Sequence, residues 1–169
     1  SLLRDHGQSE KYHSEIVGTN SRMSELIAAV LNIKLRHLTD WSTSRRAIAA
    51  MYAERLADLE EVELPVEPSW AHSVYHLYVV HVPERDRIRE LLAAEGVATG
   101  LHYPTPIHLQ PAYSALEHGP GSFPNAERSA SMLLSLPMFP ELTEAQVDRV
   151  CSALRSAVES TLRRPGGRT

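Results

Sequence analysis

The sequence predicts a mixed α/β fold in which a long helical segment leads into a small α+β domain. Three patterns predict it: apolar residues at helical spacing over residues 23–59, a β-branched and aromatic run at residues 74–82, and a capped amphipathic helix near the end of the chain. The run at 74–82 is apolar on both faces, as is typical of a covered strand. We therefore expect a small sheet covered by helices.

The first half of the chain is predicted to be helical. Residues 23–59 favour one long kinked helix or two helices in sequence. Asn20 and Ser21 precede this stretch, and both are good N-cap residues, so we expect the helix to start at one of them. Pro65 and Pro68 then break helicity and favour a domain junction.

The second half predicts short strands alternating with helices. A helix is expected over residues 83–96, with Gly96 as its C-cap, and a second short strand in VATGLHY at residues 97–103. A short helix is expected to start at Asn125, and SLPM at residues 135–138 favours a third small strand.

The last helix has the clearest signals in the chain. Thr143 and Gln146 have the spacing of a capping box, and the apolar stripe that follows contains the single cysteine, Cys151. We expect this cysteine to be an inert core residue.

Composition limits the class of protein. A chain of 169 residues with 43% hydrophobic and 22% charged residues is ordinary for a soluble globular protein, and a net charge of −4 gives no case for nucleic acid or an anionic membrane. No apolar run is long enough to span a bilayer, and no signal peptide opens the chain. One cysteine excludes an internal disulfide and fits a reducing compartment. We expect a cytoplasmic protein without a nucleic-acid or membrane partner.

The stretch GTNSRMSEL concentrates polar groups before the first helix. A helix start offers free N–H groups, and an arginine beside it makes the place attractive to a phosphate or carboxylate. Asn20 and Arg22 are therefore candidate anion-binding residues. The competing interpretation is that Asn20 or Ser21 only caps the helix while Arg22 is solvated, and capping is the commoner role.

The stretch GLHYPTPIHLQPAY is the second candidate site. His102, Tyr103 and His108 lie in a proline-rich turn, which can hold side chains for a ligand at little ordering cost. No cysteine or carboxylate lies nearby to complete a metal site, so none is expected. A rigid surface loop with incidental aromatic residues is an equally good interpretation of this pattern.

No residue pattern indicates a catalytic centre. Lys34 falls on the apolar stripe of the first helix, where a lysine more often lays its stem on the core than acts as a nucleophile, and Lys11 lies in a polar stretch. Nucleotide-binding, hydrolase and zinc-peptidase motifs are absent from the sequence. The residues by themselves predict a ligand-contacting module.

Five stretches, taken in order, resemble the carboxyl-terminal half of the DegT/DnrJ/EryC1/StrS family of sugar aminotransferases. They are RDHGQ, GTNSRMSELIAAVL, YHLYVV, GLHYPTPIHLQPAY and LSLPMFPELTEAQVDRV. Each is weak alone, but five in this order are specific. Together they extend from Arg4 to about Val158.

The resemblance implies a fold and an activity. Such proteins fold like aspartate aminotransferase (fold type I), act as homodimers, and use pyridoxal 5′-phosphate to move an amino group, usually from L-glutamate, to the keto group of a nucleotide-linked deoxysugar. The implied domain organisation is the end of the large cofactor domain at 1–22, interdomain helices at 23–64, the small carboxyl-terminal domain at 65–162 and a frayed tail at 163–169.

The resemblance also implies roles for single residues. The asparagine matching Asn20 reaches across the dimer interface to the cofactor phosphate of the neighbouring subunit, and Arg22 faces anionic groups of the substrate. His102, Tyr103 and His108 line the sugar-nucleotide pocket as polar contacts.

The family's Schiff-base lysine, and the aspartate that pairs with the pyridine nitrogen, lie upstream of the matching stretches and have no counterpart here. We therefore expect a fragment of a longer protein that is inactive alone. Two alternatives stay open: a dehydratase of the same family, in which histidine replaces that lysine, and a truncated non-catalytic module that dimerises or binds nucleotide sugar. The position of the keto group and the identity of the nucleotide are also open.

Overall fold

The structure is a computed structural model that describes residues 2–163. Contacts within the chain divide it into two units, residues 1–40 and residues 41–169. Each unit is described by itself below. The predicted domain limits at residues 22, 64 and 162 stay predictions, and residues 164–169 of the predicted tail lie outside the described residues.

Unit 1 starts as a closed loop. A short 3-10 segment, η1 (Leu2–Arg4), leads into an antiparallel hairpin of β1 (Gln8–Glu10) and β2 (His13–Ser14). The chain then returns beside its own start, where the Thr19 amide donates to the Leu3 carbonyl at 2.8 Å.

Two glycines allow this close return. A Cβ on Gly18 would lie 2.2 Å from the Gly7 amide nitrogen, and a Cβ on Gly7 would lie 1.7 Å from the Ile16 carbonyl oxygen. Gly7 also has a φ of +71°, in the left-handed region that favours glycine. Larger residues at either position would force the two strands of the loop apart.

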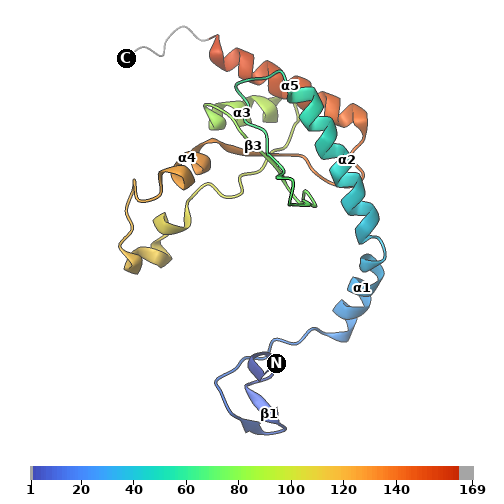
Figure 1. The fold of residues 1–169 in the computed structure, drawn as a ribbon, viewed down its shortest axis with the longest axis vertical. Coiled ribbons are helices and arrows are strands. Elements are labelled where there is room, and N and C mark those ends of the chain that lie inside the picture. The colour runs from blue at the N-terminus through green and yellow to red at the C-terminus, as the bar shows by residue number, and fades with distance from the viewer. Residues whose placement is uncertain (1, 164–169) are drawn as a thin grey trace. The chain divides into compact units, whose positions relative to one another are not determined.

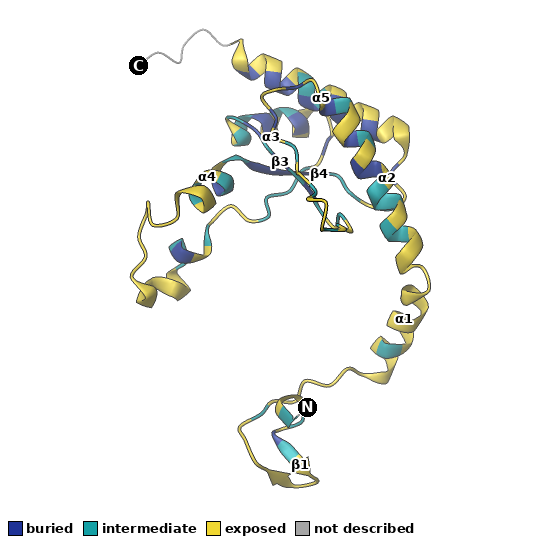
Figure 2. Cartoon of the chain, in the orientation of Figure 1, coloured by how far each residue is buried: buried dark blue, intermediate teal, exposed yellow. Residues whose placement is uncertain are grey.

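Helix α1 (Glu25–Leu35) follows, and none of its residues is buried (Figure 2). Its N-cap is Ser24, whose hydroxyl accepts from the Ile27 amide at 3.3 Å. Its exposed apolar side chains include Leu26, Ile27, Val30, Leu31 and Ile33. Within the described residues, α1 is therefore held by its backbone hydrogen bonds and its cap.

The centre of unit 2 is a two-stranded antiparallel sheet of β3 (Tyr78–His81) and β4 (Leu133–Leu136). The helices are α2 (Leu38–Leu56), which begins in unit 1, α3 (Arg85–Ala94), α4 (Pro124–Met132) and α5 (Glu144–Leu162), with the 3-10 segments η2 (Ile107–Leu109) and η3 (Pro111–Leu116). Helix α3 packs on α5 and contacts β4, while α4 contacts β3 (Figure 1).

Single-residue bridges extend this sheet at both edges. Glu63 pairs with His81 of β3, and Gly100 pairs with Ser135 of β4. All four residues of β4 are buried, and β4 lies between β3 and the bridge at Gly100. The Gly100 bridge is where the chain leaves the sheet toward the predicted ligand loop.

The hydrophobic core of unit 2 joins α2, β3, α3, β4 and α5. Its largest fully buried side chains are Tyr52, Tyr78, Leu56, Ile88, Leu92, Leu134, Leu154, Val80, Val82, Val147 and Val158. Cys151 is also buried, as predicted, and burial raises the pKa of its thiol to about 11. A thiol with so high a pKa stays protonated and unreactive at neutral pH.

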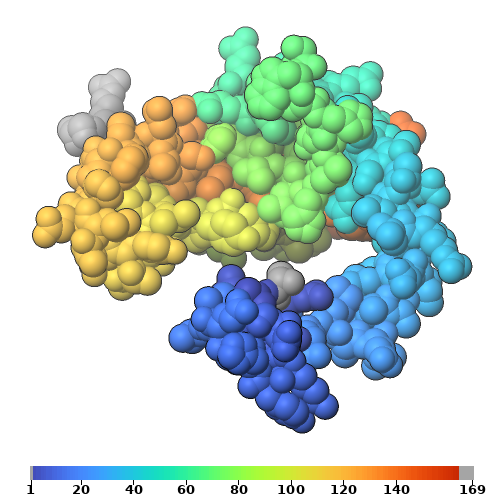
Figure 3. Space-filling model, turned by 60° about the horizontal axis from the view of Figure 1, so that its bottom comes forward, coloured from blue at the N-terminus to red at the C-terminus, as the bar shows by residue number. Residues whose placement is uncertain are grey.

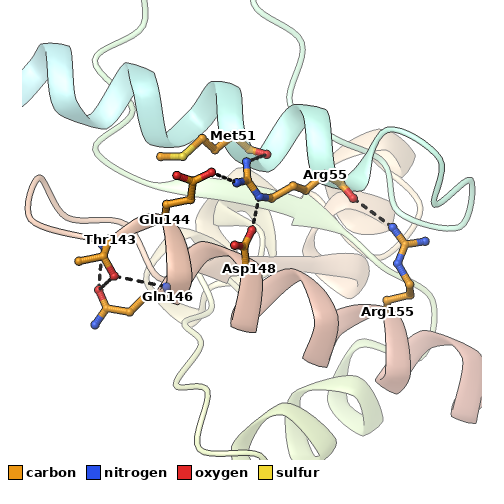
Figure 4. A network of polar contacts seen from close by, with 7 residues as sticks. All are labelled: Met51, Arg55, Thr143, Glu144, Gln146, Asp148 and Arg155. Carbon is orange, nitrogen blue, oxygen red and sulfur yellow. Dashed lines mark hydrogen bonds and ion pairs between the residues drawn. The ribbon is translucent and has the colours of Figure 1, made fainter.

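Polar contacts join α2 to α5 at the edge of the core (Figure 4). Arg55 contacts Asp148 and, at 2.6 Å, Glu144. Arg155 of α5 donates to the Arg55 carbonyl of α2 at 3.0 Å, which adds a second polar contact between these two helices. At the start of α5, the capping box of Thr143 and Gln146 is confirmed.

The predicted helices are confirmed, whereas the limits of the predicted strands are wrong. The first helical segment is two helices, interrupted at residues 36–37. The strand expected at 74–82 covers only 78–81, because Tyr75 has a φ of +46° and Arg46 holds the Ser73 carbonyl at 2.7 Å.

Two further strand predictions also need correction. The strand expected in VATGLHY is reduced to the bridge at Gly100. The strand expected at SLPM lies two residues earlier, at Leu133–Leu136, directly after α4. Among residues 2–163, no helix has the length and apolarity needed to cross a bilayer.

Two buried tyrosines provide a test of the packing. The Tyr52 hydroxyl donates to the Pro137 carbonyl at 2.9 Å, whereas the Tyr78 hydroxyl is buried and no described residue bonds it. Tyr52→Phe should lower the free energy of unfolding by about 1 kcal/mol, since it leaves a carbonyl unpaired. Tyr78→Phe should leave it unchanged or raise it. Urea unfolding of both variants measures this, and an equal loss in the two would contradict it.

Candidate functional site

Asn20 lies on the returning strand of unit 1 and forms a bridge with Asp5. Its residue is exposed, and no described residue hydrogen-bonds its side-chain amide. A buried amide would need partners within the protein, but an exposed one is free to bind a ligand or a second chain. The geometry is therefore compatible with the predicted contact to a cofactor phosphate, which stays a prediction.

The predicted capping role of Asn20 and Ser21 is wrong. Ser24 caps α1, so Asn20 lies four residues before the cap. The reason is that the backbone at this point is already paired, since the Ser21 amide donates to the Arg4 carbonyl at 2.9 Å. The electrostatic effect of a helix dipole is confined to about the first turn, so the dipole of α1 contributes little at Asn20.

Arg22 forms an ion pair with Asp5, with Nη2 and Oδ1 2.9 Å apart. The Arg22 side chain is 59% exposed and the Asp5 side chain 40% exposed, whereas the Asp5 Oδ1 atom itself is buried and accepts no hydrogen bond from the described residues. Arg22 also lines an open depression of about 510 Å³ in unit 1, together with Asp5, Glu10 and Lys11. Two cations and two anions give this depression no net attraction for an anion, and the substrate contact predicted for Arg22 stays a prediction.

The second candidate site is the loop between Gly100 and α4, which lies at the surface of unit 2 (Figure 3, yellow). It starts at His102, whose Nδ1 lies 2.9 Å from the Ser135 hydroxyl oxygen. Tyr103 follows through a cis peptide bond, is 75% exposed, and meets the His102 ring edge to face at 5.6 Å between centroids. Both side chains therefore lie at the base of the loop, with Tyr103 accessible to a ligand.

His108 belongs to the same loop but is turned inward. It is only 9% exposed, its Nε2 lies 3.0 Å from Oε1 of Glu127, and its ring contacts Phe123. Glu127 in α4 also accepts from the amides of Gly121, at 2.9 Å, and Phe123, at 3.2 Å. These contacts anchor the far end of the loop to the first turn of α4.

Three of the five predicted site residues thus belong to one loop, in which His102 contacts Tyr103 while His108 contacts Glu127 and Phe123 instead. His102, Tyr103 and His108 share one loop of unit 2, whereas Asn20 and Arg22 belong to unit 1. Sequence reasoning missed Ser135 and Glu127, which hold the two histidines. Ser135 carried a signal, because it is the one polar residue in the apolar stretch MLLSLPMF.

Unit 2, a small antiparallel sheet covered by helices with a polar loop leaving its edge, has the arrangement found in solved aminotransferase structures. The chain belongs to the DegT/DnrJ/EryC1/StrS aminotransferase family, whose sequence profile matches residues 1–155. The family assignment made from the five stretches is confirmed.

Individual relatives give the same result. The chain is 46% identical over 155 residues to the erythromycin biosynthesis sensory transduction protein EryC1 of Saccharopolyspora erythraea, covering 92% of this chain and 42% of that protein. It is 44% identical over 158 residues to a dTDP-3-amino-3,4,6-trideoxy-alpha-D-glucose transaminase of Streptomyces venezuelae, covering 94% and 42%. The chain therefore spans less than half the length of these relatives.

A solved structure confirms the predicted fold class. The structure of S. venezuelae DesV, in complex with a ketimine intermediate, matches with a TM-score of 0.88 and 42% sequence identity. The match covers 98% of this chain and 43% of that chain. The fold is thus that of part of a fold type I sugar aminotransferase.

The described residues do not form a complete site for the pyridoxal phosphate that the family implies. A Schiff-base lysine must lie in a pocket beside a partner for the pyridine nitrogen. Lys34 lies on the exposed surface of α1, and Lys11 is exposed, with its ammonium 5.1 Å from the centre of the Tyr12 ring. In residues 2–163, no cluster of histidine, cysteine or acidic side chains could hold a metal ion.

Glu127 gives the loop a predicted pH response. Hydrogen bonds from the Gly121 and Phe123 amides and from His108 hold the pKa of Glu127 below its ordinary value of 4.5. A depressed carboxyl pKa contributes stability that is present above pH 4.5 and lost as the pH falls through the folded pKa. The Gly121 amide signal should therefore titrate with a midpoint below 4.5 in NMR spectra.

Glu127→Gln should abolish this titration and speed hydrogen exchange at Gly121 and Phe123. Glu117→Gln is the matched control, because Glu117 is exposed in the same loop. A Gly121 amide that still titrates in Glu127→Gln would refute the anchoring role.

Proposed function

We propose that the chain is the carboxyl-terminal part of a pyridoxal-phosphate-dependent aminotransferase that moves an amino group from L-glutamate to a keto-deoxysugar nucleotide. The observation that carries the proposal is the family match over residues 1–155. The similarity to a transaminase named for a dTDP-linked amino sugar supports the substrate class. Residues 1–22 would form the end of the large cofactor domain, and residues 65–162 would form the small domain. The helices within residues 23–64 would connect these two domains.

The complete enzyme would act as a cytoplasmic homodimer. Bound pyridoxal phosphate would supply an electron sink for the substrate carbanion. The exposed amide of Asn20 would donate to the cofactor phosphate of the partner subunit. Arg22, whose side chain is 59% exposed, would turn from Asp5 to an anionic group of the substrate.

The loop of unit 2 would bind the sugar nucleotide. Tyr103 is accessible as a hydrogen-bonding and stacking group, and His102 has a second ring nitrogen, Nε2, that no described residue bonds. His108 was predicted as a direct contact, but its bond to Glu127 supports an indirect role, in which it shapes the loop.

The first test asks whether the chain alone holds the cofactor. After incubation with pyridoxal phosphate and borohydride, mass spectrometry should find no specific phosphopyridoxyl label on Lys11 or Lys34, because both amines are exposed and neither lies in a cofactor pocket. Trace labelling that is equal on both lysines would be random surface reaction. Specific labelling of Lys34 that Lys34→Arg removes would contradict the proposal.

The second test uses the protein in which this chain follows a large domain with the cofactor lysine. It should transaminate a nucleotide-linked keto sugar with glutamate, and Asn20→Ala should weaken pyridoxal phosphate binding by about tenfold, since one hydrogen bond to a charged phosphate is lost. Asn125→Ala, at an exposed position of α4, is the matched control. Unchanged cofactor affinity in Asn20→Ala would refute the phosphate role.

The same assay separates the alternatives. Loss of water from the sugar without amino transfer would identify a dehydratase. Binding of the nucleotide sugar without turnover would identify a non-catalytic module.

A further inference from the structure

Ser135 is a polar residue in the middle of an apolar strand. It is 4% exposed, and both its neighbours in β4, Leu134 and Leu136, are buried core residues. Its backbone is fully used, because its amide donates to the Gly100 carbonyl at 2.8 Å and its carbonyl accepts from the Gly100 amide at 3.0 Å. Only its hydroxyl is left to explain why the strand is interrupted by a serine.

That hydroxyl reaches a residue far away in the sequence. Buried hydroxyls need a partner, and Thr161 finds one within its own helix, at the Ala157 carbonyl. Ser135 instead contacts Nδ1 of His102, 33 residues earlier in the sequence, at 2.9 Å. No other described residue bonds the Ser135 hydroxyl. The pair is therefore an isolated, partly buried contact between the sheet and the loop at residues 101–123.

The direction of this hydrogen bond follows from the burial of Ser135. If Nδ1 carried the proton, it would donate to the serine oxygen, and the serine hydrogen would have no acceptor among the described residues. A buried O–H without an acceptor is destabilising. The serine hydroxyl therefore donates to Nδ1, and the neutral His102 ring carries its proton on Nε2.

Gly100 gives the ring the space that this bond requires. A Cβ at position 100 would lie 2.6 Å from Cε1 of His102 and 3.2 Å from its Nδ1. Any other residue at this position would push the ring away from Ser135. Pairing with Ser135 and space beside Gly100 thus fix the ring from two sides.

We propose that Ser135 is a positioning residue that keeps the His102 proton on Nε2, so that the ring offers an N–H donor to an oxygen acceptor of the sugar nucleotide. The acceptor would be a keto, hydroxyl or phosphate oxygen. The identity of the ligand rests on the proposed function, whereas the state of the ring does not.

The state of the ring is tested on the chain itself by nitrogen-15 NMR of the histidine side chains, at a pH where the rings are neutral. The His102 signals are assigned by their loss in His102→Gln. We expect a proton on Nε2 and an unprotonated, hydrogen-bonded Nδ1. In Ser135→Ala, the Nδ1 signal should shift toward that of a ring without this bond, and Ser135→Thr, which keeps the hydroxyl, should restore it.

A proton on Nδ1 in the unmodified chain, or identical ring signals in Ser135→Ala, would overturn the inference. If Ser135→Ala does not fold, Gly100→Ala gives an independent reading, because it displaces the ring and leaves the serine in place. Ring signals that are unchanged in Gly100→Ala would count against the proposal.

The consequence for the ligand is tested in the complete enzyme. Ser135→Ala should raise the KM for the sugar nucleotide by about five- to tenfold, as expected for one weakened hydrogen bond, and leave the half-reaction with glutamate unchanged. On a His102→Gln background it should have no further effect, since Ser135 acts only through that ring. Additive effects would contradict the positioning role.

The experiments distinguish a failure of the proposed function from a failure of the role given to Ser135. A protein that never transaminates but shows the expected ring state would refute only the proposed function. A working transaminase whose His102 carries its proton on Nδ1 would refute only the role of Ser135.

Discussion

The pairing of Ser135 with Gly100 is the constraint on which the loop at residues 101–123 depends. It consists of two short backbone hydrogen bonds, made at the edge of a strand that is buried along its whole length. One edge of β4 pairs with β3, and all four residues of β4 are buried in the core. Its other edge can therefore bind an irregular segment, which here is the chain at Gly100. A single bridge thus replaces the full strand that the sequence favoured there, and it leaves the residues that follow free to form a loop.

The loop is then fixed at its two ends by polar contacts to regular elements. His102 bonds β4 at the start of the loop. Glu127 of α4 bonds His108 in the first half of the loop and accepts from the Gly121 and Phe123 amides at its end. In both cases a histidine nitrogen is used within the protein. The aromatic and proline-rich pattern that suggested ligand contacts is therefore in part a pattern of loop architecture, and Tyr103 is left as the most accessible of the three predicted contacts.

Unit 1 follows a different principle, since its residues are held by close backbone approach rather than by a core. Gly7 and Gly18 let two segments lie in contact, and Asn20 lies in one of them, at a single-residue bridge with Asp5 instead of at a helix start. No described residue hydrogen-bonds the side-chain amide of Asn20, and Ser24 is the N-cap of α1.

The sequence by itself determined the helices, the capping box at Thr143, the buried state of Cys151 and the family. These follow from spacings within a few turns of one element, or from motifs that lie in order along the chain. Only the tertiary structure decided the strand limits, the cap at Ser24, and the pairing of His102 with Ser135 and of His108 with Glu127. Each of these depends on which backbone groups are already paired and on which residues distant in sequence become neighbours, and a local pattern carries no information about either.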